Sequence, residues 1–239
     1  MRYLILSDIH ANRAALEAVL AKAKGSYDSI LNCGDTVGYG PDPNYAAEFA
    51  RAECLHVIRG NHDKAAVGLA DLEWFNPMAR TSAEWTQTEL TRENAEWLEN
   101  LPAGPLEVNG FSMVHGSPGD EDEYMVAAED ARAAAPDATT TVSFFGHTHV
   151  AGGFEIHRSG VRILKPDLVT VDDASLWLLN PGSVGQPRDG DPRAAWALFD
   201  SGSGVLSFHR AEYDISKTFR RILDAGLPDA LGLRLYRGI

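Results

Sequence analysis

Apolar runs and helical patterns alternate along the first quarter of the chain. Short apolar runs at residues 2–7, 27–34 and 54–60 predict buried strands, and apolar residues at helical spacing predict helices over 11–24 and 43–53. Only short links separate these elements. This βαβαβ order predicts neighbouring parallel strands with the helices packed outside the sheet.

The middle of the chain departs from this alternation. Residues 71–101 are rich in helix-forming side chains, and we expect two helices there with a break near residues 91–93. A hairpin is expected to turn at Asn109-Gly110, because this dipeptide is the strongest short hairpin signal. A helix over 123–135 and a strand over 141–145 complete this region.

The last third of the chain is predicted to be rich in β-structure. Six short apolar runs are separated by Gly, Pro and Asp residues, which favours antiparallel pairing through tight turns. The expected strands are 152–157, 160–164, 167–171, 175–179, 193–200 and 204–209, with a closing helix over 215–226.

Charge and cysteine content narrow the classes of partner. The chain has 21 basic and 34 acidic residues and a formal net charge of −13, which argues against nucleic-acid polymers and anionic membranes as partners. No apolar run approaches the roughly 20 residues of a membrane span. The two cysteines, Cys33 and Cys54, lie in no CxxC pattern and are expected to be reduced thiols of a cytoplasmic protein.

Polar residues that suit metal binding follow five of the strand-like runs. In open α/β sheets such residues meet at the carboxyl edge of the sheet, and side chains two apart in an extended segment point the same way. Five of the eight histidines lie in these positions. The residues are Asp8 and His10, Asp35, Asn61 and His62, His115, and the pair His147 and His149.

Such a set of carboxylates and imidazoles predicts bound metal ions. Two nearby anionic carboxylates repel each other unless cations lie between them. Mixed Asp, His and Asn ligands suit Mn, Fe, Zn or Ni, and seven ligands suit two metals sharing a carboxylate better than one tetrahedral site. Taken singly, Asp8 could cap a helix and Asn61 could be a turn residue. Five separate strand ends are harder to explain in that way.

The ordered motifs "SDIH", "GDTVG", "GNHD", "VHGSP" and "GHTH" resemble those of the calcineurin-like metallophosphoesterase family, over about residues 1–200. The resemblance implies an α/β fold, an αββα sandwich of two packed mixed β-sheets flanked by helices. We expect one domain over 1–239, with residues 71–101 as a helical insertion. The resemblance further implies that the protein is a metal-dependent phosphoesterase that hydrolyses phosphodiester or phosphomonoester bonds of small molecules or nucleotides.

The same resemblance implies roles for individual residues. Two divalent metals, with Mn expected and Fe, Zn or Ni as alternatives, would bind at the sheet edge, and a metal-bound hydroxide would be the nucleophile. His62 would protonate the leaving oxygen, and Asp63 would either orient His62 or cap the following helix. The implied ligands are Asp8, His10 and His149 for the first metal, Asn61, His115 and His147 for the second, and Asp35 for both.

One departure from the family changes the expected substrate. Its Ser/Thr protein phosphatases carry an Asp-Arg pair after the bridging Asp, and residues 37–40 here, Val-Gly-Tyr-Gly, lack both charges. This favours the small bacterial branch that acts on small phosphoesters. Arg188 is either a substitute phosphate contact or a solvated loop residue. Trp74 and Phe75 either stack on a nucleobase or aromatic leaving group, or serve only in packing.

Two other functions use similar residues. A non-catalytic member of the family would use the fold as a protein-binding scaffold, but such members usually lose ligands or the acid, and this chain retains all of them. A two-metal peptidase has a similar ligand set without this order of motifs. The physiological substrate and the oligomeric state have no signal in the sequence.

Overall fold

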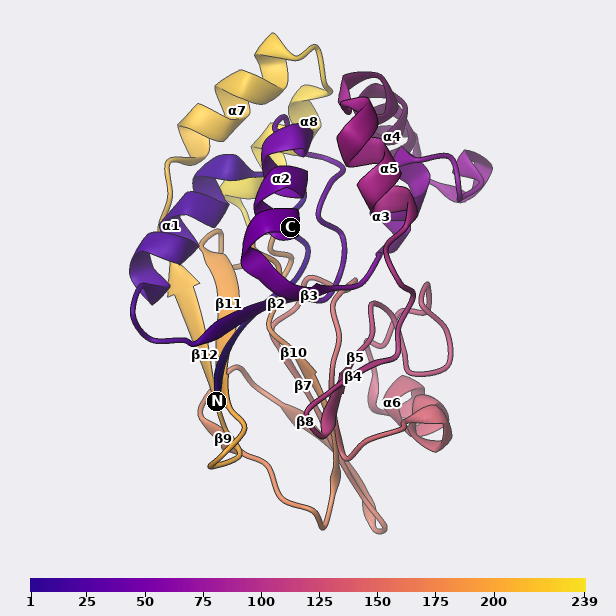
Figure 1. Cartoon of the computed structure of the whole chain (residues 1–239), viewed down its shortest axis with the longest axis vertical. Helices are drawn as coiled ribbons and strands as arrows, with labels where there is room; N and C mark the ends of the chain where they lie inside the picture. Colours follow the sequence, from indigo (N-terminus) through magenta and orange to yellow (C-terminus); the bar gives the residue numbers. More distant parts are fainter.

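Two six-stranded mixed sheets pack face to face in the computed structural model, which describes all residues from 1 to 239 (Figure 1). The first sheet has the order β3 (Cys54–Val57), β2 (Ser29–Asn32), β1 (Arg2–Leu6), β11 (Ala194–Asp200), β12 (Val205–Ala211) and β9 (Val169–Thr170). The second has the order β4 (Leu106–Val108), β5 (Phe111–Met113), β6 (Val142–Phe144), β10 (Leu176–Asn180), β7 (Gly152–His157) and β8 (Gly160–Leu164).

Strand pairing agrees with the sequence prediction at the N-terminus and among the strands after residue 150. Strands β1, β2 and β3 are parallel, as the βαβαβ order predicted. The hairpins β7–β8 and β11–β12 are antiparallel, and the β4–β5 hairpin turns at Asn109-Gly110. The strands after residue 150 pair antiparallel with one another, as predicted, and β10 also runs parallel to β6, which precedes them in the chain.

The main core fills the space between the two sheets. Tyr3 and Ile5 of β1 contact this core together with Phe144 of β6 from the opposite sheet. The alternate residue Leu4 faces outward and packs on Leu16 of helix α1 (Arg13–Ala23). Strand β1 is therefore covered on both faces, which explains its continuous apolar run.

Helices cover both outer faces, and α1 and α6 lie on opposite sides of the strands (Figure 1). No helix is long and apolar enough to cross a membrane. The remaining helices are α2 (Pro43–Glu53), α3 (Asn61–Ala66), η1 (Leu72–Trp74), α4 (Pro77–Glu89), α5 (Arg92–Glu99), α6 (Ala128–Ala134), η2 (Ala135–Asp137), α7 (Ile215–Asp224), α8 (Asp229–Leu233) and η3 (Arg234–Tyr236).

Residues 71–101 form the two expected helices, α4 and α5, preceded by the short turn η1. The break falls where expected because the Thr91 side chain accepts a hydrogen bond from Asn94 N and starts a new helix. The two largest differences from the predicted boundaries are at β3 and α6. Strand β3 ends at Val57 and α3 starts at Asn61, and helix α6 starts at Ala128, where the Asp130 carboxylate caps its first turn.

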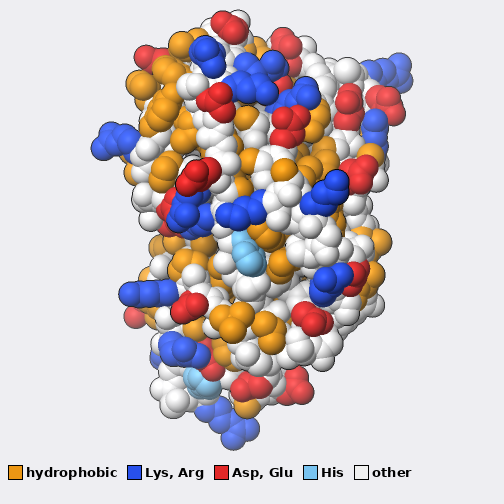
Figure 2. Space-filling view, turned by 90° about the vertical axis from the view of Figure 1, so that its left-hand side faces the viewer, with side chains coloured by type: hydrophobic (Ala, Val, Ile, Leu, Met, Phe, Trp, Pro, Cys, Tyr) orange, Lys and Arg blue, Asp and Glu red, His pale blue; other side chains and the backbone are white.

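Charged side chains of both signs are interspersed over the face shown in Figure 2. Two of the arginines with low exposure, Arg210 and Arg59, pair with carboxylates of Asp189 and Glu121. Basic side chains on this face form no continuous stripe of the kind that binds a nucleic-acid backbone.

Candidate functional site

The loops that follow β1, β2, β5 and β6 meet the first turn of α3 at one edge of the sandwich. Every residue proposed from the sequence as a metal ligand lies in this place. The side chains of six of them are at most 3% exposed, and Asn61 is half-buried. The six are Asp8, His10, Asp35, His115, His147 and His149.

The backbone at these loops is strained in a consistent way. Five of the eight non-glycine residues with positive φ in the whole chain are proposed ligands, with φ between 47° and 64°. They are Asp8, His10, Asp35, His147 and His149. The pairs Asp8/His10 and His147/His149 were predicted to lie on extended backbone, and this prediction is wrong. Left-handed backbone turns the side chains toward the site, and such strain is concentrated at functional sites.

His10 and His149 direct unprotonated nitrogens at the same point. The Nδ1 of His10 donates to the Val37 carbonyl at 3.0 Å, and that of His149 donates to the Gln186 carbonyl at 2.6 Å. Their Nε2 atoms lie 3.0 Å apart. Burial lowers the pKa of both imidazoles well below the usual value, so both rings are neutral. Two facing lone pairs repel each other, and a cation between them would remove that repulsion.

A second cluster lies beside the first and consists of Asp35, His115 and His147. The Nδ1 of His115 donates to the Cys33 carbonyl at 2.8 Å, and its Nε2 lies 3.3 Å from Asn61 Oδ1. The Nε2 of His147 donates to the Asp122 carbonyl at 3.1 Å. Its Nδ1 is therefore the nitrogen with a free lone pair.

Asp35 belongs to both clusters. Its Oδ2 lies 3.5 Å from His10 Nε2 and 3.4 Å from His115 Nε2, while its Oδ1 accepts a hydrogen bond from His62 N at 2.8 Å. Burial raises the pKa of Asp35, but the neighbouring imidazoles, His115 foremost, together outweigh burial and hold this pKa well below its usual value. The same pairing raises the pKa of His115 to about 10, although burial opposes it.

The donors fit divalent metal ions. Four donor atoms in the first cluster lie within 4.8 Å of one another, as do three in the second. Asp8 Oδ2 and Asp35 Oδ2 are buried and accept no hydrogen bond of normal geometry. Burial raises the pKa of Asp8 to about 7, since nothing nearby fully compensates its charge. Two buried His/Asp clusters with a shared carboxylate and unpaired oxygens have the chemistry of a metal-binding site.

Glycine at two positions allows the backbone to approach these ligands. A Cβ at Gly60 would overlap Asp35 Oδ1, and a Cβ at Gly34 would lie 2.6 Å from His115 Nδ1. Neither position can carry a side chain while the ligands stay in place.

His62 lies outside both clusters and beside them. Its ring is 5% exposed and lies 5.0 Å from the His10 ring and 4.2 Å from the Tyr39 ring, measured between centroids. Its Nδ1 has no hydrogen-bond partner. Burial lowers the pKa of His62 to about 4, so the ring is neutral in the metal-free protein.

Of the two roles considered for Asp63, its hydrogen bonds are those of a residue that caps the start of a helix. Its carboxylate accepts hydrogen bonds from the backbone N–H groups of Thr36, Val37 and Gly60 at 3.0–3.2 Å, and it makes no hydrogen bond to the His62 ring. These bonds tie the loop after β2 to the start of α3. Asp63 therefore places His62 through the backbone rather than through the imidazole.

Arg188 is held beside the site without a carboxylate partner. Its guanidinium donates to Gln186 Oε1 at 2.9 Å and lies 5.6 Å from the centre of the Tyr39 ring. Its backbone N–H donates to the His149 carbonyl at 3.1 Å. The guanidinium makes no ion pair, so its charge remains available to an anionic ligand.

Three residues near the site had no role in the sequence prediction. Tyr39 lies between Gly38 and Gly40, and its ring covers one side of His62. Tyr124 stacks on the His147 ring with 3.7 Å between centroids, and the Asp122 carbonyl holds the same histidine. The Gly-Tyr-Gly sequence after Asp35 was a usable signal for Tyr39. Nothing in the local sequence marks Asp122 or Tyr124.

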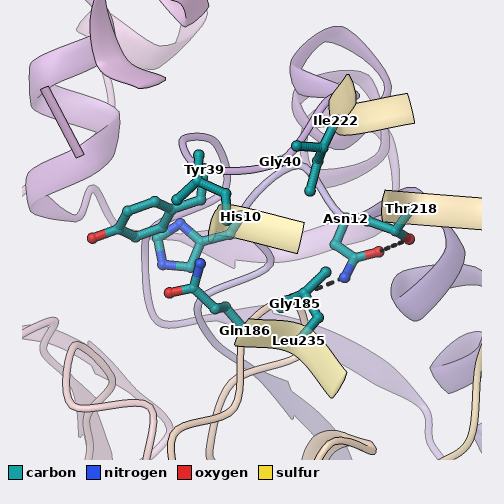
Figure 3. Close-up of a pocket in the computed structure, with 10 residues that line it drawn as sticks. His10, Asn12, Tyr39, Gly40, Gly185, Gln186, Thr218, Ile222 and Leu235 are labelled. Atoms are coloured by element: carbon teal, nitrogen blue, oxygen red, sulfur yellow. Dashed lines mark hydrogen bonds between the residues drawn. The ribbon is translucent and has the colours of Figure 1, made fainter. Parts of the chain in front are cut away.

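A small cavity lies behind His10, between the site and the C-terminal helices (Figure 3). Its volume of about 10 Å³ holds no more than one water molecule. His10 and Tyr39 line one side, and on the other side Thr218 Oγ1 donates to Asn12 Oδ1 at 2.9 Å (Figure 3). This cavity is too small for a substrate.

A larger cleft of about 530 Å³ reaches the second cluster at His147. Asn61, His62 and His147 line it where it meets the candidate ligands, Phe75 lies against the His62 ring, and Trp74 also lines the cleft. Trp74 is 88% exposed. The structure therefore places Trp74 in the wall of the cleft that leads to the candidate metal ligands.

Comparison with known proteins agrees with this geometry. Residues 1–203 match the model of the calcineurin-like phosphoesterase superfamily domain. An uncharacterized protein of Methanocaldococcus jannaschii is 35% identical over 247 residues, covering 98% of this chain and 97% of that protein. A metallophosphoesterase from Sphaerobacter thermophilus has a similar crystal structure, with a TM-score of 0.88 and 41% identity over 100% of this chain and 99% of that one.

A hypothetical protein from Pyrococcus horikoshii has the same fold, with a TM-score of 0.81 and 21% identity over 100% of this chain and 98% of that one. The ordered motifs, the two sheets and the buried His/Asp clusters agree with the match to the family model. The chain therefore belongs to the calcineurin-like phosphoesterase superfamily.

Proposed function

We propose that the protein is a dinuclear metal-dependent phosphoesterase that hydrolyses phosphodiester or phosphomonoester bonds of small molecules or nucleotides. The observation that carries this proposal is the pair of buried clusters that share Asp35, one of which reaches a cleft through His147. Phosphoryl transfer requires mainly positioning and charge neutralisation, and this arrangement offers both.

The proposed ligands divide between two metal ions, with Mn as the expected metal. Asp35 would contact both ions, because its Oδ2 lies at similar distances from His10 and His115. When bound, two such metals supply an acidified water and neutralise the phosphoryl oxygens. The first ion would be held by Asp8, His10 and His149, and the second by Asn61, His115 and His147.

His62 is proposed as the group that protonates the leaving oxygen. It lines the cleft and is not part of either cluster. The ring is neutral in the free protein, and an adjacent phosphoryl anion would favour its protonated form. Asp63 has an indirect role, because it fixes the turn that carries His62.

Arg188 is proposed to contact a phosphoryl oxygen. Replacing it by Gln should raise KM for a phosphodiester by about tenfold and change kcat less, because one charge-assisted hydrogen bond is lost. Steady-state kinetics with bis-p-nitrophenyl phosphate measures this. Arg193→Gln is the matched control, since Arg193 is exposed and pairs with Asp191. An unchanged KM in Arg188→Gln would assign Arg188 to the loop structure alone.

The proposed function predicts a metal requirement. Chelator-treated protein should lose hydrolysis of p-nitrophenyl phosphate and bis-p-nitrophenyl phosphate by more than about 100-fold and regain it when Mn is added. Elemental analysis of the reconstituted protein should give two metal ions per chain. If the protein binds metal but hydrolyses neither ester when loaded with Mn, Fe, Zn or Ni, the result would favour the non-catalytic scaffold. Absence of metal binding would contradict the proposal itself.

A further inference from the structure

The outer part of the cleft is lined by exposed apolar side chains, which phosphoester hydrolysis itself does not require. Three exposed apolar side chains line it, with exposed fractions of 88% for Trp74, 51% for Tyr124 and 49% for Leu69. Trp74 lies in the η1 turn, in the segment between α3 and α4 (Figure 1). Exposed apolar side chains grouped around one cleft are typical of a surface that is covered by a ligand.

The charged side chains that line the cleft limit how much negative charge a bound ligand can carry there. The only basic residue in the lining is Lys64, which is 8% exposed. Its ammonium lies 3.0 Å from Glu121 Oε1 and 2.6 Å from Asp122 Oδ2, so two carboxylates already neutralise it. Asp71 adds a further carboxylate to the lining.

A chain of several phosphates would therefore be disfavoured in the outer cleft. Apart from Arg188 beside Tyr39, which is assigned to the phosphoryl group under attack, such a chain would meet Asp71 and Asp122 and no unpaired lysine or arginine in the lining. A neutral flat group would instead stack on Trp74, because an exposed aromatic face binds such groups without requiring charge.

We propose that the outer cleft binds a neutral aromatic group, such as a nucleobase or an aryl ester, of a substrate that carries its negative charge only at the phosphoryl group under attack. This inference rests on the proposed phosphoesterase function and specifies its substrate class. A nucleoside monophosphate ester or an aryl phosphodiester fits both ends of the cleft. A sugar phosphate lacks the stacking group, and a nucleoside polyphosphate carries excess charge.

The test measures binding of two non-hydrolysable ligands to the Mn-loaded protein by calorimetry. Phenylphosphonate should bind about tenfold more tightly than ethylphosphonate, since one aromatic stacking contact separates them. In Trp74→Ala the two affinities should agree within about twofold. Leu168→Ala, which removes an exposed apolar side chain outside the cleft, should preserve the tenfold preference.

A third ligand tests the charge of the outer cleft. Phenylphosphonate with a carboxylate at the para position should bind more weakly than phenylphosphonate, and Asp71→Asn should reduce that difference. Equal binding of the phenyl and ethyl ligands, or a phenyl preference that survives in Trp74→Ala, overturns the inference and leaves the phosphoesterase function standing. Tighter binding of the carboxylate ligand also overturns it. If neither phosphonate binds the Mn-loaded protein, the proposed function fails as well.

Discussion

Asp35→Asn is expected to lower kcat for phosphodiester hydrolysis by on the order of 10³-fold or more and to reduce bound metal from two ions to none. The substitution keeps the shape of the side chain and an oxygen that can accept the His62 N–H hydrogen bond. It removes the one negative charge that both clusters share. Both metals should be lost together because each uses the same carboxylate.

The measurement combines kcat with elemental analysis of the variants after dialysis. Asp8→Asn is the variant to compare with Asp35→Asn, because Asp8 belongs to the first cluster only. The Asp8→Asn protein should lose one metal ion and retain the other. Glu107→Gln removes an exposed carboxylate on β4 and controls for net charge. Thermal unfolding of the chelated proteins shows whether each variant folds. Two bound metals and a wild-type rate in Asp35→Asn would contradict the shared role of this residue.

Much of this site could be predicted from the sequence because its chemistry is local. Each proposed ligand follows a short apolar run, and parallel strands bring their carboxyl ends to one edge. The backbone conformation could not be predicted in the same way. Asp8 and His147 adopt left-handed φ values that no propensity favours strongly. Packing between distant segments sustains this strain: the Asp8 carboxylate accepts a hydrogen bond from His147 N at 3.2 Å.

The residues that surround the ligands were missed for a related reason. Tyr124 stacks on His147, but the two are far apart in sequence and no periodicity links them. The same holds for the sheets. Strand β11 lies antiparallel beside β1, and β10 lies parallel to β6. The alternation of apolar and polar residues within a strand shows which of its faces is buried, but it does not identify the neighbouring strand. Local patterns predict elements and strand-end chemistry, while long-range pairing decides which elements meet.

His62→Ala should affect substrates unequally, and this difference tests the role proposed for His62. Hydrolysis of a diester with an alkyl or nucleoside leaving group should fall by about 10²–10³-fold, because an alkoxide needs a proton in the transition state. Nitrophenyl esters should lose about tenfold or less, since nitrophenolate leaves without protonation. The dependence of kcat on leaving-group pKa, measured over a series of diesters, should therefore become steeper in the variant.

Two controls separate proton donation from structural damage. Elemental analysis should still find two metals in His62→Ala, because His62 belongs to neither cluster. His62→Gln, which fills more of the space between Tyr39 and Phe75, should show the same steeper dependence as His62→Ala. His209→Ala, which removes a partly buried histidine stacked on Trp196 away from the site, should leave the dependence unchanged.

An equal loss for both classes of ester would mean that His62 shapes the cleft without donating a proton. The leaving oxygen would then take its proton from another group, and Tyr39, whose ring lies against His62 and lines the same cleft, would be the first residue to replace.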